Sequence, residues 1–384
     1  MPSSRTALLL IALLLPPSAH ADTWRVGPGE TLTRIAQAAR VAKDGDTVEI
    51  AAGIYRGDVA VWTQDQLTIR GLGRGAVLEA DGASAGDKAI WVIRGGAIRV
   101  ENIEFRGARV PDLNGAGIRF ERGTLHLRNT RFFDNENGIL ASNNPAASLH
   151  IEDSEFGAAP KHPGALHHLL YVGRIGEVVV RGSRFSGGYH AHLIKSRAMR
   201  SRIEYNLLDD GPDGEAAYEL EFPDGGAAIV IGNIIAQSPR TTNSALISYA
   251  AESTHWADNS IALSHNTLVN PLPASGWFLR VWHRQGAANV SVVARNNLLV
   301  GHGRFDSSVP PPHDGNLPAS LGDLADPARH DYQLRNTPRL WGHTAPAGDW
   351  SGIDLTPTRS FALPHTTLPL TPPETWQPGA LQRP

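Results

Sequence analysis

One short motif recurs along most of this chain. It consists of a β-rich run, a residue that is usually small and polar, one further residue, and then Phe, Leu or Ile. It occurs eight times, at intervals of 23 to 33 residues, without helical periodicity. Such a repeat is typical of a β-solenoid, in which each coil buries its apolar face against the next coil. The residues at the usually polar position are Ile103, Thr130, Ser154, Ser183, Asn206, Asn233, Asn266 and Asn297.

The repeat predicts an all-β fold, a parallel β-helix in which these positions stack in one column. Asn is favoured there because its side-chain amide can bond to the backbone or to the Asn one coil away. A β-sandwich with coincidental spacing is the alternative, and eight aligned segments argue against it.

The two ends of the chain differ from this repeat. Residues 31–43 have apolar positions at helical spacing, which predicts one amphipathic helix. We expect this helix to cap the open end of the β-helix, because an exposed sheet edge invites aggregation. Residues 304–384 are rich in proline and have few strand-like runs, so we expect an irregular tail packed along the β-helix. The predicted order is a cap over about residues 22–60, coils over about 61–303, and the tail, all in one domain.

The first residues read as an export signal. Arg5 precedes an apolar run, and an A-x-A sequence ends at Ala21. This order is typical of a signal peptide, so we expect residues 1–21 to be removed and the protein to be periplasmic or secreted. The apolar run is too short to span a membrane. The chain has no cysteine, which excludes disulfides and thiolate metal sites.

The charge of the chain restricts its partners. The formal net charge is −3 at pH 7, which disfavours nucleic acid, so any polyanion must meet a local basic patch. Residues 190–206 contain such a patch. We expect a monomer that binds an acidic polysaccharide or oligosaccharide there. The basic residues of the patch are Lys195, Arg197, Arg200 and Arg202.

Strand alternation places further polar residues in line with Lys195. Outward positions of five successive strand-like segments recur at intervals of 24, 26, 27 and 32 residues, which follow the lengths of the coils. They are predicted to form one column, with about 4.8 Å between neighbouring coils. The column consists of Tyr171, Lys195, Glu221, Ser248 and Arg280.

Two segments supply candidate substrate-binding residues. In residues 218–222, alternation directs Tyr218 inward and both glutamates outward. In residues 277–283, it directs the arginine and the second tryptophan outward. Aromatic residues among the charges favour a sugar-binding groove over an ordinary solvated face, because sugar faces stack on aromatic rings. The predicted substrate-binding residues are Glu219, Glu221, Arg280 and Trp282.

Segments near both ends resemble those of a known superfamily. Residues 45–55, followed by residues 67–73, are similar to the opening of right-handed parallel β-helix proteins of the pectin-lyase-like superfamily. Residues 331–342 resemble the closing segment of such proteins. The resemblance covers about residues 22–303 and implies a right-handed parallel β-helix.

A second resemblance concerns function. Residues 194–208 resemble the lysine-bearing strand of the alginate-lyase and chondroitin-lyase-B type of β-helix lyases, in which a hydrophobic-Lys-Ser triplet precedes an Asn-containing turn. This resemblance implies a polysaccharide lyase whose base is Lys195. The chain departs from the pattern on the next coil, where Glu219 and Glu221 stand in place of an Arg-His pair. Only Lys195 is therefore carried over.

The chemistry of a lyase assigns roles to several residues. β-Elimination of a uronate needs a cation at the carboxylate, a base for the C5 proton and an acid at the leaving oxygen. Lys195 or Arg197 could hold the carboxylate. A Lys195 crowded by Arg197 and Arg200 would have a lowered pKa and could itself be the base. The other candidates for base or acid are Tyr171, His168 and His192.

Two metal sites are conceivable. Glu219, Glu221 and Asp224 could hold Ca²⁺, although we favour their pairing with arginines. His168 and His192 start adjacent strands, but the H-x-H spacing is a weak zinc signal. We therefore assign no residue to a metal.

We predict an exported polysaccharide lyase that cleaves a uronate-containing chain. A uronate C5-epimerase is an alternative, because it shares the proton abstraction. A glycoside hydrolase is another, since Glu219 and Glu221 are expected about 6.5 Å apart on one strand face. The alternative without catalysis is a carbohydrate-binding scaffold.

Overall fold

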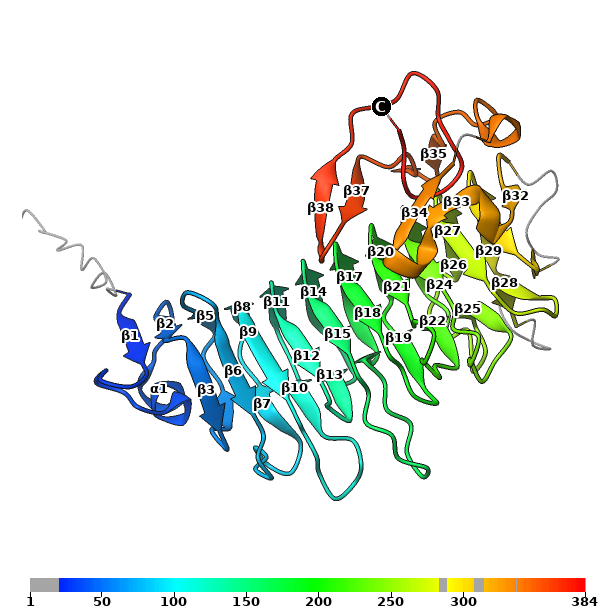
Figure 1. The fold of residues 1–384 in the computed structure, drawn as a ribbon. Helices are drawn as coiled ribbons and strands as arrows, with labels where there is room; N and C mark the ends of the chain where they lie inside the picture. Colours follow the sequence, from blue (N-terminus) through cyan, green and yellow to red (C-terminus); the bar gives the residue numbers. More distant parts are fainter. Residues whose placement is uncertain (1–20, 283–288, 307–313, 336, 384) are drawn as a thin grey trace, which may run out of the picture.

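The computed structural model describes residues 21–282, 289–306, 314–335 and 337–383. The chain forms an elongated solenoid in which three long parallel sheets run side by side (Figure 1). Each coil contributes one strand to each sheet, so the predicted all-β parallel β-helix is confirmed. The predicted signal peptide lies, up to residue 20, outside the described residues.

The sheets are named A, B and C, in the order in which they follow the cap. Sheet A contains β1 (Thr23–Val26), β2 (Thr47–Ile50), β5 (Gln66–Gly71), β8 (Ala97–Glu101), β11 (Thr124–Arg128), β14 (Asn144–Glu152), β17 (Ile175–Arg181), β20 (Arg200–Glu204), β23 (Ala227–Ile231), β26 (Ser260–Ser264) and β29 (Ser291–Arg295). Sheet B contains β3 (Gly53–Arg56), β6 (Ala76–Glu79), β9 (Ile103–Arg106), β12 (Arg131–Phe133), β15 (Glu155–Gly157), β18 (Arg184–Ser186), β21 (Leu207–Asp209), β24 (Ile234–Ala236), β27 (Thr267–Asn270), β30 (Leu298–Gly301) and β32 (Leu317–Ala319). Sheet C contains β4 (Ala60–Trp62), β7 (Ala89–Ile93), β10 (Ala116–Phe120), β13 (Asn137–Ala141), β16 (Leu170–Val172), β19 (His192–Ser196), β22 (Tyr218–Phe222), β25 (Ala245–Tyr249), β28 (Gly276–Val281) and β31 (Gly303–Phe305).

The column of polar repeat residues lies at the turns between sheets A and B. The side-chain amide of Asn206 donates to Oδ1 of Asn233 at 3.0 Å, and that of Asn233 donates to Asn266 at 3.0 Å. Asn266 contacts Asn297 in the same way at 2.9 Å. All four side chains are buried, so the predicted asparagine ladder is confirmed. Toward the N-terminus, the ladder continues with Ser183, Ser154 and Thr130.

A left-handed backbone conformation precedes each ladder asparagine. The residues Tyr205, His265 and Asn296 have φ of 56°, 49° and 57°. This conformation costs a non-glycine residue roughly 1–2 kcal/mol. The buried amide contacts of the ladder offset that cost, because they satisfy backbone groups at the same turns.

The core repeats the same principle with apolar residues. Phe105, Phe132, Phe156 and Phe185 stack along sheet B, with ring centroids 5.1, 4.6 and 4.5 Å apart. All four rings are buried. Parallel pairing in register brings equivalent positions together, so a side chain repeated in the sequence stacks on its own kind.

The predicted capping helix is confirmed as α1 (Ile35–Val41). It buries Ile35 and Ala38 against the first coils. The Asp58 carboxylate accepts hydrogen bonds from the backbone amides of Ile35 at 2.6 Å and Ala36 at 3.0 Å. These contacts satisfy two free N–H groups at the start of the helix. No helix among the described residues has the length and apolar character needed to cross a membrane.

The C-terminal tail lies along the second half of the solenoid, shown in orange and red in Figure 1. Its Leu334 and Phe361 pack in a cluster with side chains of sheet B, and its Leu355 packs against sheet A. Neither of these clusters contains a described residue of sheet C. The tail therefore covers two faces and leaves the third open. Its short elements are η1 (Leu321–Asp323), β33 (Leu324–Asp326), η2 (Pro327–Arg329), β34 (Asp331–Leu334), η3 (Pro338–Leu340), β35 (Asp349–Trp350), β36 (Ile353–Asp354), β37 (Arg359–Ala362) and β38 (Thr366–Pro369).

The ladder predicts a large effect of Asn233→Ala on stability. The amide of Asn233 also donates to the carbonyl of Ile203 at 2.7 Å, and its Oδ1 accepts from the backbone amide of Asn206 at 2.9 Å. Loss of these buried contacts should lower the free energy of unfolding by about 3–5 kcal/mol in a urea titration. Asn233→Ser should lose less, because a hydroxyl occupies the same position at Ser183 and Ser154. Equal losses in the two variants would contradict this account.

Candidate active site

The predicted outward column exists on sheet C. Strand pairing sets Tyr171 opposite Lys195, Lys195 opposite Glu221, Glu221 opposite Ser248, and Ser248 opposite Arg280. The tail clusters leave this sheet free. The column thus lies on the one long face that the tail does not cover.

The predicted orientations of Tyr218 and Glu219 are wrong. Leu193 and Ile194, at the equivalent positions of the preceding coil, are both fully buried in the core. Glu219 and Leu220 follow the same pattern, and Glu219 has no exposed surface. The strands of sheet C therefore direct two consecutive residues inward, which shifts simple alternation by one. Tyr218 faces the groove instead, and its ring lies 5.0 Å from that of His192.

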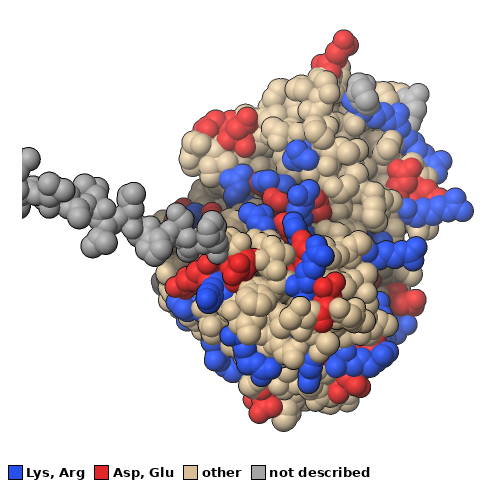
Figure 2. Space-filling view, turned by 90° about the vertical axis from the view of Figure 1, so that its left-hand side faces the viewer, with Lys and Arg blue, Asp and Glu red and all other residues tan. Residues whose placement is uncertain are grey.

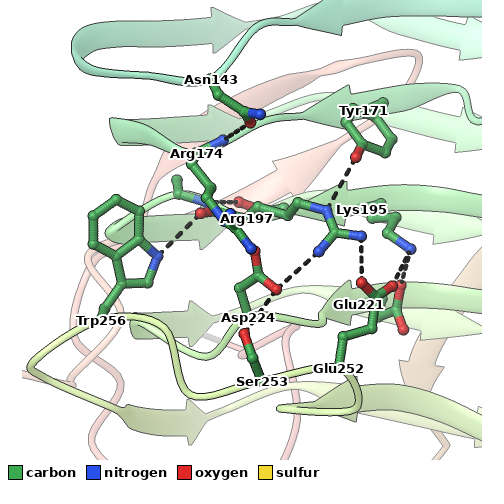
Figure 3. A network of polar contacts seen from close by, with 12 residues as sticks. Asn143, Tyr171, Arg174, Lys195, Arg197, Glu221, Asp224, Glu252, Ser253 and Trp256 are labelled. Carbon is green, nitrogen blue, oxygen red and sulfur yellow. Dashed lines mark hydrogen bonds and ion pairs between the residues drawn. The ribbon is translucent and has the colours of Figure 1, made fainter.

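Lys195 is held by two carboxylates from later coils (Figure 3). Its Nζ lies 3.0 Å from Glu221 Oε2 and 3.1 Å from Glu252 Oε1. His192 Nε2 lies 2.9 Å from the same oxygen of Glu221. Arg200, which was expected to crowd Lys195, lies in β20 of sheet A and pairs with Glu177 at 3.5 Å. The environment of Lys195 is therefore one of opposite charges.

Arg197 links the column to the loops beside it. Its Nε donates to the hydroxyl of Tyr171 at 3.0 Å, and its other nitrogens lie 2.8 Å from Asp224 and 2.6 Å from Glu252. Arg174 lies 2.8 Å from the second oxygen of Asp224. Figure 3 shows these side chains converging from successive coils.

The cluster is electrically balanced. Its three cations, Lys195, Arg197 and Arg174, equal its three carboxylates in number. Burial opposes ionisation of Asp224, but contacts with Arg174 and Arg197 outweigh it and hold the pKa of this carboxyl below its usual range. The pKa of Glu252 is lowered in the same way by Arg197 and Lys195. All members are thus charged at neutral pH.

Glu252 differs from the other two acids in exposure. Its side chain is 47% exposed, whereas those of Glu221 and Asp224 are 5% and 1% exposed. It lies on the turn between β25 and β26, and it bridges Lys195 to Arg197. It is therefore the carboxylate that another anion could replace most easily.

The two histidines are brought together, as predicted. The rings of His168 and His192 lie 4.9 Å apart, and Nδ1 of His168 accepts from the backbone amide of His192 at 3.3 Å. Burial holds the pKa of His168 well below its usual range, so this ring is neutral. His192 instead contacts Glu221.

The acidic residues proposed for Ca²⁺ do not converge. Glu219 is in the core, whereas Glu221 and Asp224 pair with cations, which was the favoured alternative. Among the described residues, no group of three or more His, Asp or Glu has the arrangement of a metal site.

The far end of the column is aromatic. The guanidinium of Arg280 lies 3.7 Å from the ring centroid of Trp282 and 5.6 Å from that of Trp277. Trp282 Nε1 donates to Ser248 Oγ at 3.1 Å. The predicted substrate-binding residues Arg280 and Trp282 therefore share one surface with the column, whereas Glu219 does not.

Figure 2 shows the molecule from its N-terminal end, where basic and acidic side chains lie interspersed. The ion pair of Arg70 and Glu49, at 2.5 Å, is one example on sheet A. This face therefore offers no continuous basic surface, which keeps attention on sheet C.

No protein-family model and no curated protein matches this chain. Two solved structures share its architecture. Pectate lyase Pel9A has a TM-score of 0.58 at 12% identity, over 87% of this chain and 95% of that one. The alginate lyase from Paenibacillus sp. str. FPU-7 has a TM-score of 0.50 at 14% identity, over 78% of this chain and 98% of that one.

This chain has the pectate-lyase fold. The likeness confirms the parallel β-helix of pectin-lyase-like proteins that the terminal segments imply. At these identities it concerns the fold alone, so the roles of the residues rest on the geometry of the site.

Three residues of the site escaped sequence reasoning. Glu252 and Arg174 lie in turns at the ends of sheet C strands, where strand alternation gives no direction. Arg119 occupies the position of the column two coils before Tyr171, through Leu140. Extending the column backward by coil lengths would have found it.

Burial of Glu219 predicts that Glu219→Leu stabilises the protein. Neither carboxyl oxygen has a hydrogen-bond partner. Burial, with Asp210 as a further cause, raises the pKa of Glu219 well above its ordinary value of 4.5. Replacement by leucine should therefore raise the free energy of unfolding at pH 7 by about 1–3 kcal/mol.

The pH dependence provides a control for this prediction. An acid with a raised folded-state pKa contributes stability below its unfolded pKa, and that contribution is lost as the pH rises. The advantage of Glu219→Leu should therefore shrink between pH 7 and pH 4 in thermal unfolding curves. A variant that is less stable than the parent at pH 7 would refute the assignment.

Proposed function

We propose that this protein is an exported lyase that cleaves a uronate-containing polysaccharide by β-elimination. The observation that carries the proposal is the open column of sheet C, in which Lys195 and Arg197 adjoin the hydroxyl of Tyr171. An extended groove of this kind suits a polymer. The names of the two solved lyases with this fold agree with the reaction class.

We assign the uronate carboxylate to the place that Glu252 occupies. Glu252 presents two oxygens to Lys195 and Arg197 at 3.1 and 2.6 Å, which is the contact that a sugar carboxylate would make. Two cations at this carboxylate would stabilise the negative charge that develops when the C5 proton leaves. In this assignment Lys195 is an electrostatic catalyst, and its role as the base, which the lyase resemblance implies, is not favoured.

We assign the proton transfer to Tyr171. Its hydroxyl accepts a hydrogen bond from Arg197 at 3.0 Å, so the guanidinium can stabilise negative charge on the phenol oxygen during the transfer. His192 and Glu221 hold Lys195 in place from the other side. His168 and His192 remain candidates for the acid at the leaving oxygen.

Hydrolysis is disfavoured by the position of Glu219. The proposed pair of carboxylates required Glu219 and Glu221 on one face, and Glu219 is in the core. An epimerase shares the site chemistry with a lyase, so only the product distinguishes them. Export is proposed from the pattern of residues 1–21.

A panel of uronans tests the proposal. The expected result is an ultraviolet-absorbing unsaturated product, with a kcat/KM that falls on the order of 100-fold in Lys195→Ala. Lys161→Ala is the matched control, because Lys161 is exposed on a loop and pairs with Glu215. Deuterium incorporation at C5 without the unsaturated product would indicate an epimerase, and binding alone would indicate a scaffold. Full activity of Lys195→Ala would overturn the site assignment.

Glu252→Gln should strengthen substrate binding. The substitution removes the charge that competes with the uronate, while Lys195 and Arg197 keep Glu221 and Asp224. The KM for a uronan should fall by about 2- to 5-fold, as expected for loss of a half-exposed ion pair. Glu177→Gln, which breaks an ion pair on sheet A, should leave KM unchanged. An increase in KM for Glu252→Gln would mean that Glu252 itself binds the sugar.

A further inference from the structure

A cavity of about 400 Å³ lies on sheet C, on the N-terminal side of Tyr171. Its wall combines one arginine with amide, hydroxyl and imidazole groups, and with the exposed side chain of Leu166. No other charged residue lines it. The polar residues of the wall are Asn114, Arg119, Asn137, Ser142, His168 and Tyr171.

Arg119 has no counter-ion in the part of the chain that the structure describes. Its Nε is buried and has no hydrogen-bond partner. Glu121, the acid that acts on it electrostatically, is held by Lys88 at 3.0 Å and by Arg94 at 2.6 Å. Desolvation by burial lowers the pKa of the guanidinium, which nevertheless stays protonated at neutral pH. A half-buried cation without a partner is costly unless a ligand supplies the opposite charge.

Arg119 thus differs from the other cations of the groove. Lys195, Arg197 and Arg174 each contact at least one carboxylate within 3.1 Å. An anion that binds at Lys195 must first displace Glu252, whereas one that binds at Arg119 displaces no carboxylate. The uncompensated positive charge of the groove therefore lies in the cavity, away from the Lys195 cluster.

We infer that the Arg119 cavity binds a second carboxylate of the polysaccharide, on a sugar residue other than the one that reacts. This inference rests on the proposed function. Arg119 and Lys195 occupy equivalent positions three coils apart, so about 14 Å separates them along the groove. A chain of several uronate residues reaches both positions, whereas a disaccharide held at Lys195 does not reach Arg119.

Chain length is the readout that tests the inference. The affinities of a uronate hexasaccharide and disaccharide are compared by calorimetry for the parent protein and Arg119→Ala. The hexasaccharide should lose about 10- to 100-fold in affinity, and the disaccharide less than about 2-fold, because one charge-assisted contact is removed. Arg119→Lys should recover part of the loss. Arg122→Ala, which removes an exposed arginine just beyond the same strand, should change neither.

Two further arms separate the explanations. The thermal stability of Arg119→Ala should equal or exceed that of the parent, because the removed cation has no protein partner. A sulfated glycan without uronate should not show the Arg119-dependent affinity. Equal binding of the hexasaccharide by Arg119→Ala and the parent would overturn the inference, and so would equal losses for both chain lengths. Arg119-dependent binding without an unsaturated product would instead refute the lyase proposal and keep the inference.

Discussion

The in-register pairing of parallel strands is the constraint on which this structure depends. Because each strand of a sheet sets its residues beside equivalent residues of the next coil, a side chain repeated in the sequence becomes a column in space. The ladder through Asn233, the phenylalanine stack through Phe132 and the polar column through Lys195 are three results of this rule. The first two stabilise the solenoid, and the third gives one of its faces a chemical character.

The same rule explains what could be predicted from the sequence. The repeat length fixes the register, so the pairing of Tyr171 with Lys195 and of Lys195 with Glu221 follows from counting residues. The direction of Glu219 does not follow, because sheet C strands turn two neighbours inward. The apolar pairs Leu193-Ile194 and Leu246-Ile247 at equivalent positions were the visible sign of this departure.

Contacts that cross coils through turns are harder to predict. Glu252 meets Lys195 across 57 residues of sequence, from a turn whose path no strand pattern determines. The balance of three cations and three carboxylates was therefore hidden, and residues 190–206 read as a basic patch. A balanced cluster attracts anions weakly at long range, but it holds its groups in fixed positions, which is what selective binding at short range requires.

The placement of the tail has a consequence for how such a protein can change in length. The apolar clusters of the tail involve coils from Tyr205 onward, whereas the coils from β4 to β9 carry neither tail contacts of this kind nor groove cations on sheet C. A solenoid gains or loses coils as whole units, since each contacts only its neighbours. The N-terminal third is therefore the part of the molecule where a coil can be added or deleted, and the C-terminal half is clamped at a fixed length.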